Sequence, residues 1–234
     1  MNRGTVYRFR FATVFCLCLG SAQAQQTIFN VPSADITDKG SIYLEHESQF
    51  RTWEPGRYWF GSDYFAAGLG HDTEVDVTLY NTSVPASGNV SAGVGFRSVF
   101  PLLATTQKSA ELKWAVGSQA LISFEGRGAG YWAYSHFSGR LPKLNTRLTS
   151  GISAGTRQLF GENTVHFIGG VEQPLTKTLS LMADWYSGNH SAGYLTAGGS
   201  VSFRKGFTLF AGCQRPNTER VGRAGITLEL AKIF

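Results

Sequence analysis

A histidine, a serine and an asparagine in the middle of the sequence have the types and spacing for acyl-transfer chemistry. His136 and Ser138 are two residues apart, so both side chains would share one face of a β-strand. A histidine placed in this way can take the proton of a serine hydroxyl and make its oxygen a nucleophile. Asn145 follows across an expected turn and could orient the imidazole as a third catalytic group. The alternative is that His136 and Ser138 are girdle and turn residues without a catalytic role.

The elements that would have to position these side chains are β-strands. From residue 41 onward, alternating polarity and turn residues divide the sequence into twelve segments. Each segment has about the length that a tilted membrane-crossing strand needs. An even number of antiparallel strands would put both chain ends on the periplasmic side. The expected strands cover residues 41–52, 58–69, 74–84, 90–100, 111–123, 129–138, 146–157, 163–173, 178–187, 193–204, 207–215 and 223–234.

The alternation of polarity is clearest late in the sequence, where Leu195 and Val201 alternate with Thr196 and Ser202. A soluble β-sandwich would alternate too, but its apolar face would point into an internal core. Here the polar faces are rich in glycine, serine and threonine, and aromatic residues cluster near strand ends, as in interfacial girdles. The sequence therefore predicts an all-β fold, a single antiparallel transmembrane β-barrel over residues 41–234.

The first 24 residues have the features of an export signal. Arg3, Arg8 and Arg10 precede an apolar stretch at 11–20, and a small-residue cleavage site ends at Ala24. An apolar stretch of about ten residues is too short to span a bilayer as a helix. We predict that residues 1–24 are a signal peptide for the Sec pathway, cleaved after Ala24.

Two readings are open for the polar segment at residues 25–40, which precedes the first expected strand. It could hang in the periplasm as a lead-in segment, or it could fold into the barrel as a plug. The sequence leaves both open.

Charge and cysteine content argue against several classes of function. The chain has 21 Lys and Arg against 16 Asp and Glu; three arginines and no acidic residue lie in the leader, which leaves a net charge near +2. This balance does not favour a nucleic-acid partner. Of the three cysteines only Cys213 lies outside the leader, so no intramolecular disulfide framework is expected. No clustered ligand set or phosphate loop is present, and we expect neither a metal nor a cofactor.

The polar faces of the expected strands would line the lumen, because a basic residue facing lipid costs about 2–4 kcal/mol at the midplane. Such residues could form ion pairs that fill a narrow barrel. They could instead line a water-filled pore whose transverse field selects small polar solutes. The expected inward-facing residues are Glu45, Glu47, Arg51, Asp76, Arg97, Lys113, Arg147, Arg157, His166, Glu172, Asp184, Arg204 and Glu229.

The last strand segment ends on an aromatic residue. Its arrangement of Gly225, Leu228, Leu230 and Phe234 resembles the C-terminal assembly signal of Gram-negative outer-membrane β-barrels. The resemblance implies that this strand pairs with the barrel-assembly machinery and then closes the barrel against the first strand. It also implies residence in the outer membrane, in contact with its lipids and lipopolysaccharide.

The segment around the candidate catalytic residues resembles outer-membrane phospholipase A, which carries a His-x-Ser-Asn-Gly segment, and the His-x-Ser of lipid A deacylases. That resemblance implies lipid hydrolysis by His136, Ser138 and Asn145. The sequence departs from the pattern at Gly139, where those families carry asparagine. The expected strand direction also puts Ser138 near the periplasmic end, whereas those enzymes act at the outer leaflet.

Taken together, these features predict an outer-membrane barrel that acts as a narrow porin-like channel for small polar solutes. Two alternatives are a structural barrel without a pore and an outer-membrane lipid hydrolase. The balanced charge of the expected lumen predicts neither anion nor cation preference.

Overall fold

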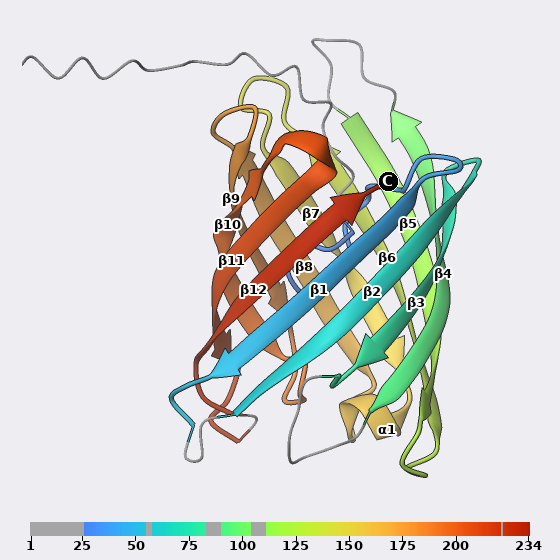
Figure 1. Ribbon diagram of the computed structural model, residues 1–234, viewed down its shortest axis with the longest axis vertical. Helices are drawn as coiled ribbons and strands as arrows, with labels where there is room; N and C mark the ends of the chain where they lie inside the picture. The colour runs from blue at the N-terminus through green and yellow to red at the C-terminus, as the bar shows by residue number, and fades with distance from the viewer. Residues whose placement is uncertain (1–25, 55–57, 83–89, 104–110, 221) are drawn as a thin grey trace, which may run out of the picture.

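Twelve strands, each antiparallel to its neighbours in sequence, form the wall of the molecule. β12 pairs with β1 and closes the sheet into a barrel (Figure 1). The computed structural model describes residues 26–54, 58–82, 90–103, 111–220 and 222–234. The strands are β1 (Ile42–Arg51), β2 (Tyr58–Gly70), β3 (Thr73–Tyr80), β4 (Ser91–Leu103), β5 (Glu111–Ser123), β6 (Ala129–Arg140), β7 (Arg147–Gly155), β8 (Val165–Pro174), β9 (Leu179–Tyr186), β10 (Tyr194–Ser202), β11 (Phe207–Pro216) and β12 (Gly225–Ile233).

The expected fold class is confirmed, and every expected strand has an observed counterpart. The largest difference is in β3, which ends at Tyr80 rather than at residue 84. The expected signal peptide and its cleavage site lie outside the described residues. Within those residues, no helix has the length and apolarity needed to cross a bilayer.

The wall has an apolar outer face and a polar inner face. In β4, Val94 and Phe96 are 60% and 48% exposed, whereas Arg97 is 2% exposed. In β12, Leu228 and Leu230 point outward, and Thr227 and Glu229, which alternate with them, are buried. Alternate residues of a strand point to opposite faces, so these patterns place the aliphatic side chains where lipid would lie and the polar ones in the lumen.

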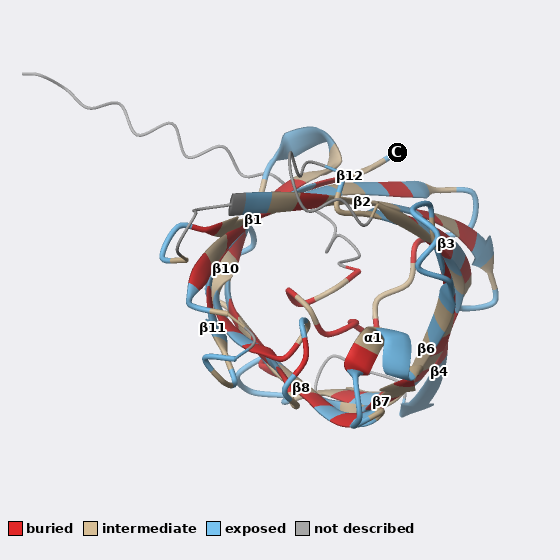
Figure 2. Ribbon diagram, turned by 90° about the horizontal axis from the view of Figure 1, so that it is seen from below, coloured by how far each residue is buried: buried red, intermediate tan, exposed pale blue. Residues whose placement is uncertain are grey.

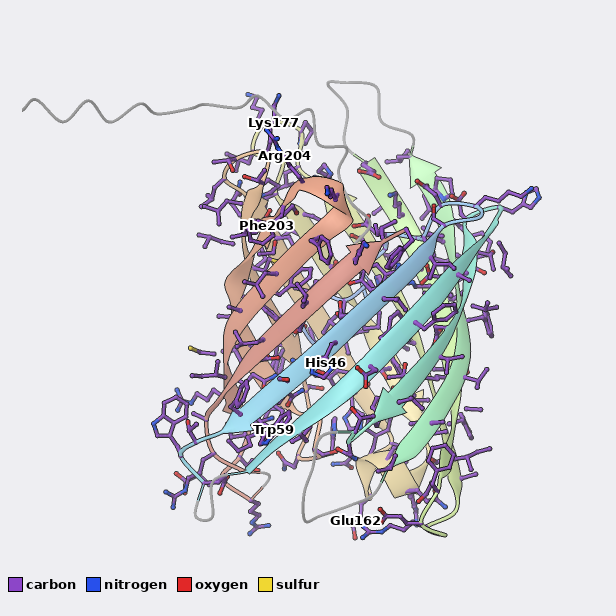
Figure 3. The ribbon with its side chains drawn as sticks, in the orientation of Figure 1. His46, Trp59, Glu162, Lys177, Phe203 and Arg204 are labelled. Carbon is purple, nitrogen blue, oxygen red and sulfur yellow. The ribbon has the colours of Figure 1, made fainter. Side chains whose placement is uncertain are left out.

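The two ends of the barrel carry different connections. Figure 3 labels Lys177 and Arg204 at the end where β12 finishes, and Glu162 at the opposite end. The first end carries the 3-10 helix η1 (Arg204–Gly206), and the second carries the short helix α1 (Arg157–Phe160). In an outer-membrane barrel the short turns would lie in the periplasm, so the end with Lys177 and Arg204 is here called the periplasmic end and the opposite one the outer end.

Two residues expected on the inner wall lie outside it. Arg157 has the inward parity of β7, but that strand ends at Gly155 and the chain turns into α1, where Arg157 is exposed. Arg204 likewise follows the end of β10 and is exposed in η1. In both cases the expected strand was two residues too long, and the predicted inward position is wrong.

Residues 26–40, here called the luminal segment, lie inside the barrel. Figure 2 looks along the barrel and shows this chain within the ring of strands. Its first part is a tight hairpin, in which the Ile28 N–H donates to the Val31 carbonyl at 2.8 Å and the Ser33 N–H to the Gln26 carbonyl at 3.0 Å. The segment leaves the lumen beside β2, where the Gly40 N–H donates to the Gly68 carbonyl at 3.0 Å.

Glycines on the wall make room for the luminal segment. A Cβ atom added to Gly68 would lie 2.1 Å from the Asp38 carbonyl oxygen, and one added to Gly170 would lie 2.3 Å from Ile28 Cδ1. Ile28, Phe29 and Val31 are buried against inward-facing wall residues that include Tyr43, Ile168, Met182 and Phe210. The lumen therefore contains an apolar cluster as well as the expected polar groups.

Candidate functional site: the lumen and its luminal segment

An arginine–glutamate pair on two neighbouring strands binds both ends of the hairpin. Arg97 on β4 is 2% exposed and Glu74 on β3 is 0% exposed. Arg97 Nε donates to Glu74 Oε1 at 3.0 Å, while its Nη1 donates to the carbonyl oxygens of Gln26 at 2.6 Å and Ser33 at 3.1 Å. A buried guanidinium needs such partners, because an unpaired buried charge is very costly.

The other oxygen of Glu74 binds the luminal segment directly. Glu74 Oε2 accepts from the Thr37 backbone N–H at 2.8 Å and from Gln26 Nε2 at 3.2 Å. Gln26 Nε2 also donates to Thr37 Oγ1 at 2.7 Å. The two ends of the segment are thus joined to one carboxylate. Charge-assisted hydrogen bonds of this kind are stronger than neutral ones.

Asp184, on β9, binds the tip of the hairpin. Its Oδ2 accepts from three consecutive backbone N–H groups, those of Phe29 at 3.0 Å, Asn30 at 2.5 Å and Val31 at 2.7 Å. The Asn30 side chain donates to Thr196 Oγ1 on β10 at 2.7 Å. Successive N–H groups that converge on one anion form a nest, here occupied by a carboxylate of the wall.

Near the periplasmic end, Arg147 on β7 joins the wall to the luminal segment. Its Nη2 donates to Glu172 Oε1 on β8 at 2.6 Å, and its Nη1 lies 2.7 Å from Asp35 Oδ1. Burial pushes the pKa of Asp35 upward, but the attraction and hydrogen bond of Arg147 outweigh it and the pKa is lowered. At the same end, Lys113 and Arg140 both pair with Glu111.

Carboxylates gather on the inner face of the β1–β12 seam. Glu47 stands opposite Glu229 in the register of the two strands, and Glu45 is two residues along β1. Tyr43 donates its hydroxyl to Glu45, and Thr227 donates to Glu47 Oε1 at 3.1 Å. Arg51 lies at the outer end of β1, where it donates to Gln214 at 2.8 Å and to Gln49 at 2.7 Å.

Aromatic rings gather at the outer end of the lumen. The rings of His166 and His190 are 4.1 Å apart, and Phe160 of α1 lies 4.8 Å from each. Tyr186 donates its hydroxyl to Ser153. Burial lowers the pKa of His190, which lies in the loop between β9 and β10, to about 4. This imidazole is therefore neutral at physiological pH.

Most of the expected inward-facing residues lie on the inner wall, and several of them bind the luminal segment. Asp76 is bound to Gln119 Nε2 at 2.7 Å and stays within the wall, as do Glu45, Glu47 and Glu229. Sequence reasoning missed Glu74 and the hairpin residues. Glu74 has the same parity as Asp76 in β3, so the alternation could have identified it. The hairpin contacts carry no local pattern that could have done so.

The three candidate catalytic residues are not joined by hydrogen bonds. His136 and Ser138, on β6, face the lumen of the barrel and are 1% and 2% exposed, respectively. His136 has no hydrogen bond to Ser138 or Asn145, and Thr149 Oγ1 donates to Ser138 Oγ at 3.3 Å. Asn145 is exposed in the turn after β6, where its Oδ1 accepts from Arg140 Nη1 at 3.1 Å. Within the described residues, no group of histidine, cysteine and carboxylate side chains could hold a metal ion.

Residues of the expected assembly signal lie on both faces of β12. Leu228, Leu230 and Phe234 are exposed on the outside. Gly225 is buried, and a Cβ atom there would lie 2.4 Å from Nη1 of Arg51. The Phe234 backbone pairs with Ile42 in both directions at the start of β1, at 2.9 and 3.3 Å. Recognition by an assembly machinery stays a prediction.

No protein-family model matches the chain, and no curated protein matches it in sequence. Solved structures do match. The KdgM porin aligns with a TM-score of 0.51 and 10% identity, over 83% of this chain and 99% of that chain. The KdgM porin in complex with disordered oligogalacturonate aligns with the same values. The fold is that of an outer-membrane β-barrel. LpxR from Salmonella typhimurium aligns with a TM-score of 0.46 and 11% identity, over 82% of this chain and 100% of that chain. At such identities the likeness concerns the fold alone.

Proposed function

We propose that the protein is a narrow outer-membrane channel for small polar solutes, and that the luminal segment closes it at rest. One observation carries the proposal: Arg97 and Glu74, which pair with each other, and Asp184 are buried wall charges that also bind groups of the luminal segment. Water or a polar solute could replace those partners, because each is a single hydrogen-bonding group.

The closure of the wall does not depend on the luminal segment. β1 pairs with β12 from Tyr43↔Ile233 to Phe50↔Ile226, so the hydrogen-bond ladder runs around the barrel without help from residues 26–40. Removal of the segment would expose polar and apolar wall groups to water, but it would not break the β1–β12 ladder that closes the sheet. Because the sheet closes without the luminal segment, the segment fits the role of a gate better than that of a structural core.

A structural barrel without a pore is the second candidate. The burial of Ile28, Phe29 and Val31 in the lumen favours it, since apolar burial contributes about 25 cal/mol per Å² to stability. The two candidates differ in what happens when the segment is removed. A gated channel would conduct, whereas a structural barrel would not conduct or would not fold.

The test is the planar-bilayer conductance of the mature protein with and without residues 26–38. We expect closed or rarely open behaviour from the intact protein, and larger and more frequent openings after the deletion. Each protein must first show a different gel migration when boiled and unboiled, which reports a folded barrel. Absence of conductance from both folded proteins would overturn the channel and support the structural barrel.

A reversible lock offers a sharper version of the same test. Asn30 and Thr196 are joined by a hydrogen bond of 2.7 Å between the hairpin tip and β10. We expect the pair Asn30→Cys and Thr196→Cys, with Cys213→Ala, to hold the channel closed when oxidised and to restore wild-type openings when reduced. Asn30→Cys alone is the control, since it cannot form the bond. Equal conductance in both redox states would count against gating by this segment.

A further inference from the structure

One pair of ionisable side chains lies on the outer, apolar face of the barrel wall. His46, in the middle of β1, and Asp63, in the middle of β2, both point outward among apolar neighbours (Figure 3 labels His46). Both side chains are 47% exposed. Away from the strand ends, they are the only outward-facing acidic or basic side chains in the described strands. Ionisable groups at membrane depth are costly and are a sign of function.

These two residues are bound to each other and to polar neighbours. His46 Nδ1 lies 2.7 Å from Asp63 Oδ1, and His46 Nε2 lies 3.1 Å from Ser48 Oγ. Thr82 Oγ1 donates to Asp63 Oδ2 at 2.9 Å. We call His46, Ser48, Asp63 and Thr82 the outer polar patch. Its internal bonds reduce the cost of exposure to lipid, but about half of the His46 side chain and half of the Asp63 side chain stay uncovered.

The surface around the outer polar patch is suited to contact with a large partner. A hollow of about 410 Å³ opens there, with Leu44, Phe65, Leu79 and Leu230 in its lining. Ser48 stands opposite Gly61 in the register of β1 and β2, so small residues lie beside the charged pair. Small and polar residues together are typical of contacts between membrane segments. Figure 2 shows that the wall formed by β12, β1 and β2 is flat, while the opposite wall is curved.

We propose that the outer polar patch is the interface through which two copies of this chain form a dimer in the membrane. Two copies in one membrane are related by a two-fold axis along the membrane normal, so each residue keeps its depth. His46 and Asp63 are directly opposite in the strand register, so their depths differ by less than the ~4.8 Å between neighbouring strands. The patch carries an imidazole and a carboxylate that can bind one another, and a two-fold axis brings His46 of each copy to Asp63 of the other. Such a patch is self-complementary, as a symmetric interface requires.

This inference does not rest on the proposed channel function, because it concerns the outer face only. A lipid headgroup is a weaker candidate, since the patch lies in the middle of the strands and headgroups lie at the membrane surfaces. A phospholipid chain would not pair with an imidazole or a carboxylate.

Charge exchange tests the symmetry directly. His46→Asp puts two acids in the patch and Asp63→His puts two histidines there. Each variant alone should be monomeric by analytical ultracentrifugation in mild detergent, while wild type is dimeric. An equal mixture of the two variants should form heterodimers, because each contact then joins an acid to a histidine. Heat-dependent gel migration confirms that each variant is folded. A monomeric wild type, or a mixture without heterodimers, overturns the proposal.

Cross-linking in native outer membranes avoids the effect of detergent. In a Cys213→Ala background, Ser48→Cys should give at least ten times more cross-linked dimer than Ser150→Cys, an exposed outward position on β7. Equal yields from the two positions contradict the interface. Monomers that lose a co-purified lipid when His46 is changed would instead assign the patch to lipid and also overturn the dimer.

Discussion

Arg147 Nη1 lies 2.7 Å from Asp35 Oδ1, and this ion pair joins strand β7 to the luminal segment. Arg147 keeps a second carboxylate, Glu172, on the neighbouring strand. The wall therefore stays neutralised if the segment leaves, while Asp35 loses its cation. This asymmetry makes Asp35 a suitable residue with which to probe the luminal segment without damage to the barrel.

Replacement of Asp35 by asparagine should weaken the attachment of the luminal segment by about 1.5–3 kcal/mol, the range for a hydrogen bond to a charged group. The pKa of Asp35 is lowered from about 3.8, so its contribution is fully present above that value and is lost as pH falls through the lower, folded-state value. We expect wild type, but not Asp35→Asn, to lose this increment of stability below about pH 4. Urea unfolding at several pH values measures it, with the exposed Asp38→Asn as control. Parallel pH profiles for wild type and Asp35→Asn would contradict the assignment.

Gly170→Ala should displace the hairpin from the wall. The added methyl group would lie 2.3 Å from Ile28 Cδ1, and overpacking of this kind costs about 1–3 kcal/mol. Under the proposed function, the variant should open more often in bilayer recordings. The matched control is Gly169→Ala on the outer face, where the nearest atom is a ring carbon of Phe167 at 3.0 Å. Ile28→Ala should rescue Gly170→Ala, because it removes the atom that clashes. Failure of that rescue would show that the effect comes from the strand itself.

Deletion of Phe234 should lower the yield of folded protein in cells by several fold, while protein that does fold keeps its conductance. Phe234 is 59% exposed and contributes little to the packing of the barrel, so a loss of yield would reflect recognition during assembly. Phe234→Tyr keeps an aromatic ring and should behave as wild type. Outer-membrane fractionation followed by a gel of unboiled samples measures the folded fraction. An unchanged yield after deletion would show that the resemblance to an assembly signal is accidental.

Ser138→Ala should not change the rate of any hydrolysis of phospholipid or lipid A. Ser138 is bound to Thr149 rather than to His136, and Asn145 is bound to Arg140, so no base is poised on the hydroxyl. Fluorogenic phospholipid and purified lipid A, with and without Ca²⁺, are the substrates to use. Turnover that disappears in both Ser138→Ala and His136→Ala would revive the lipid hydrolase.

The wall of the barrel could be predicted from the sequence because its cause is local. Period-two alternation such as that of Leu228, Glu229 and Leu230 encodes which face of a strand meets lipid, and turn residues encode where strands end. The predicted inward positions of Arg157 and Arg204 were wrong because both residues lie two positions beyond a strand end, where the alternation of polarity continues but strand pairing stops. The same alternation could have identified Glu74, and it predicted the inward position of Arg97 and Asp184.

The contents of the lumen and the polar pair on the outer face were decided by the tertiary structure. The luminal segment binds wall residues that are far away in sequence, 37 positions for Thr37 with Glu74 and 155 for Phe29 with Asp184. No pattern in residues 26–40 predicts those partners, because the charges that hold the segment come from different strands and lie close together only in the closed barrel. His46 and Asp63 likewise meet only through the pairing of β1 with β2. Local polarity set the wall by itself, whereas long-range pairing of charges determined what the wall holds and what it presents to a partner.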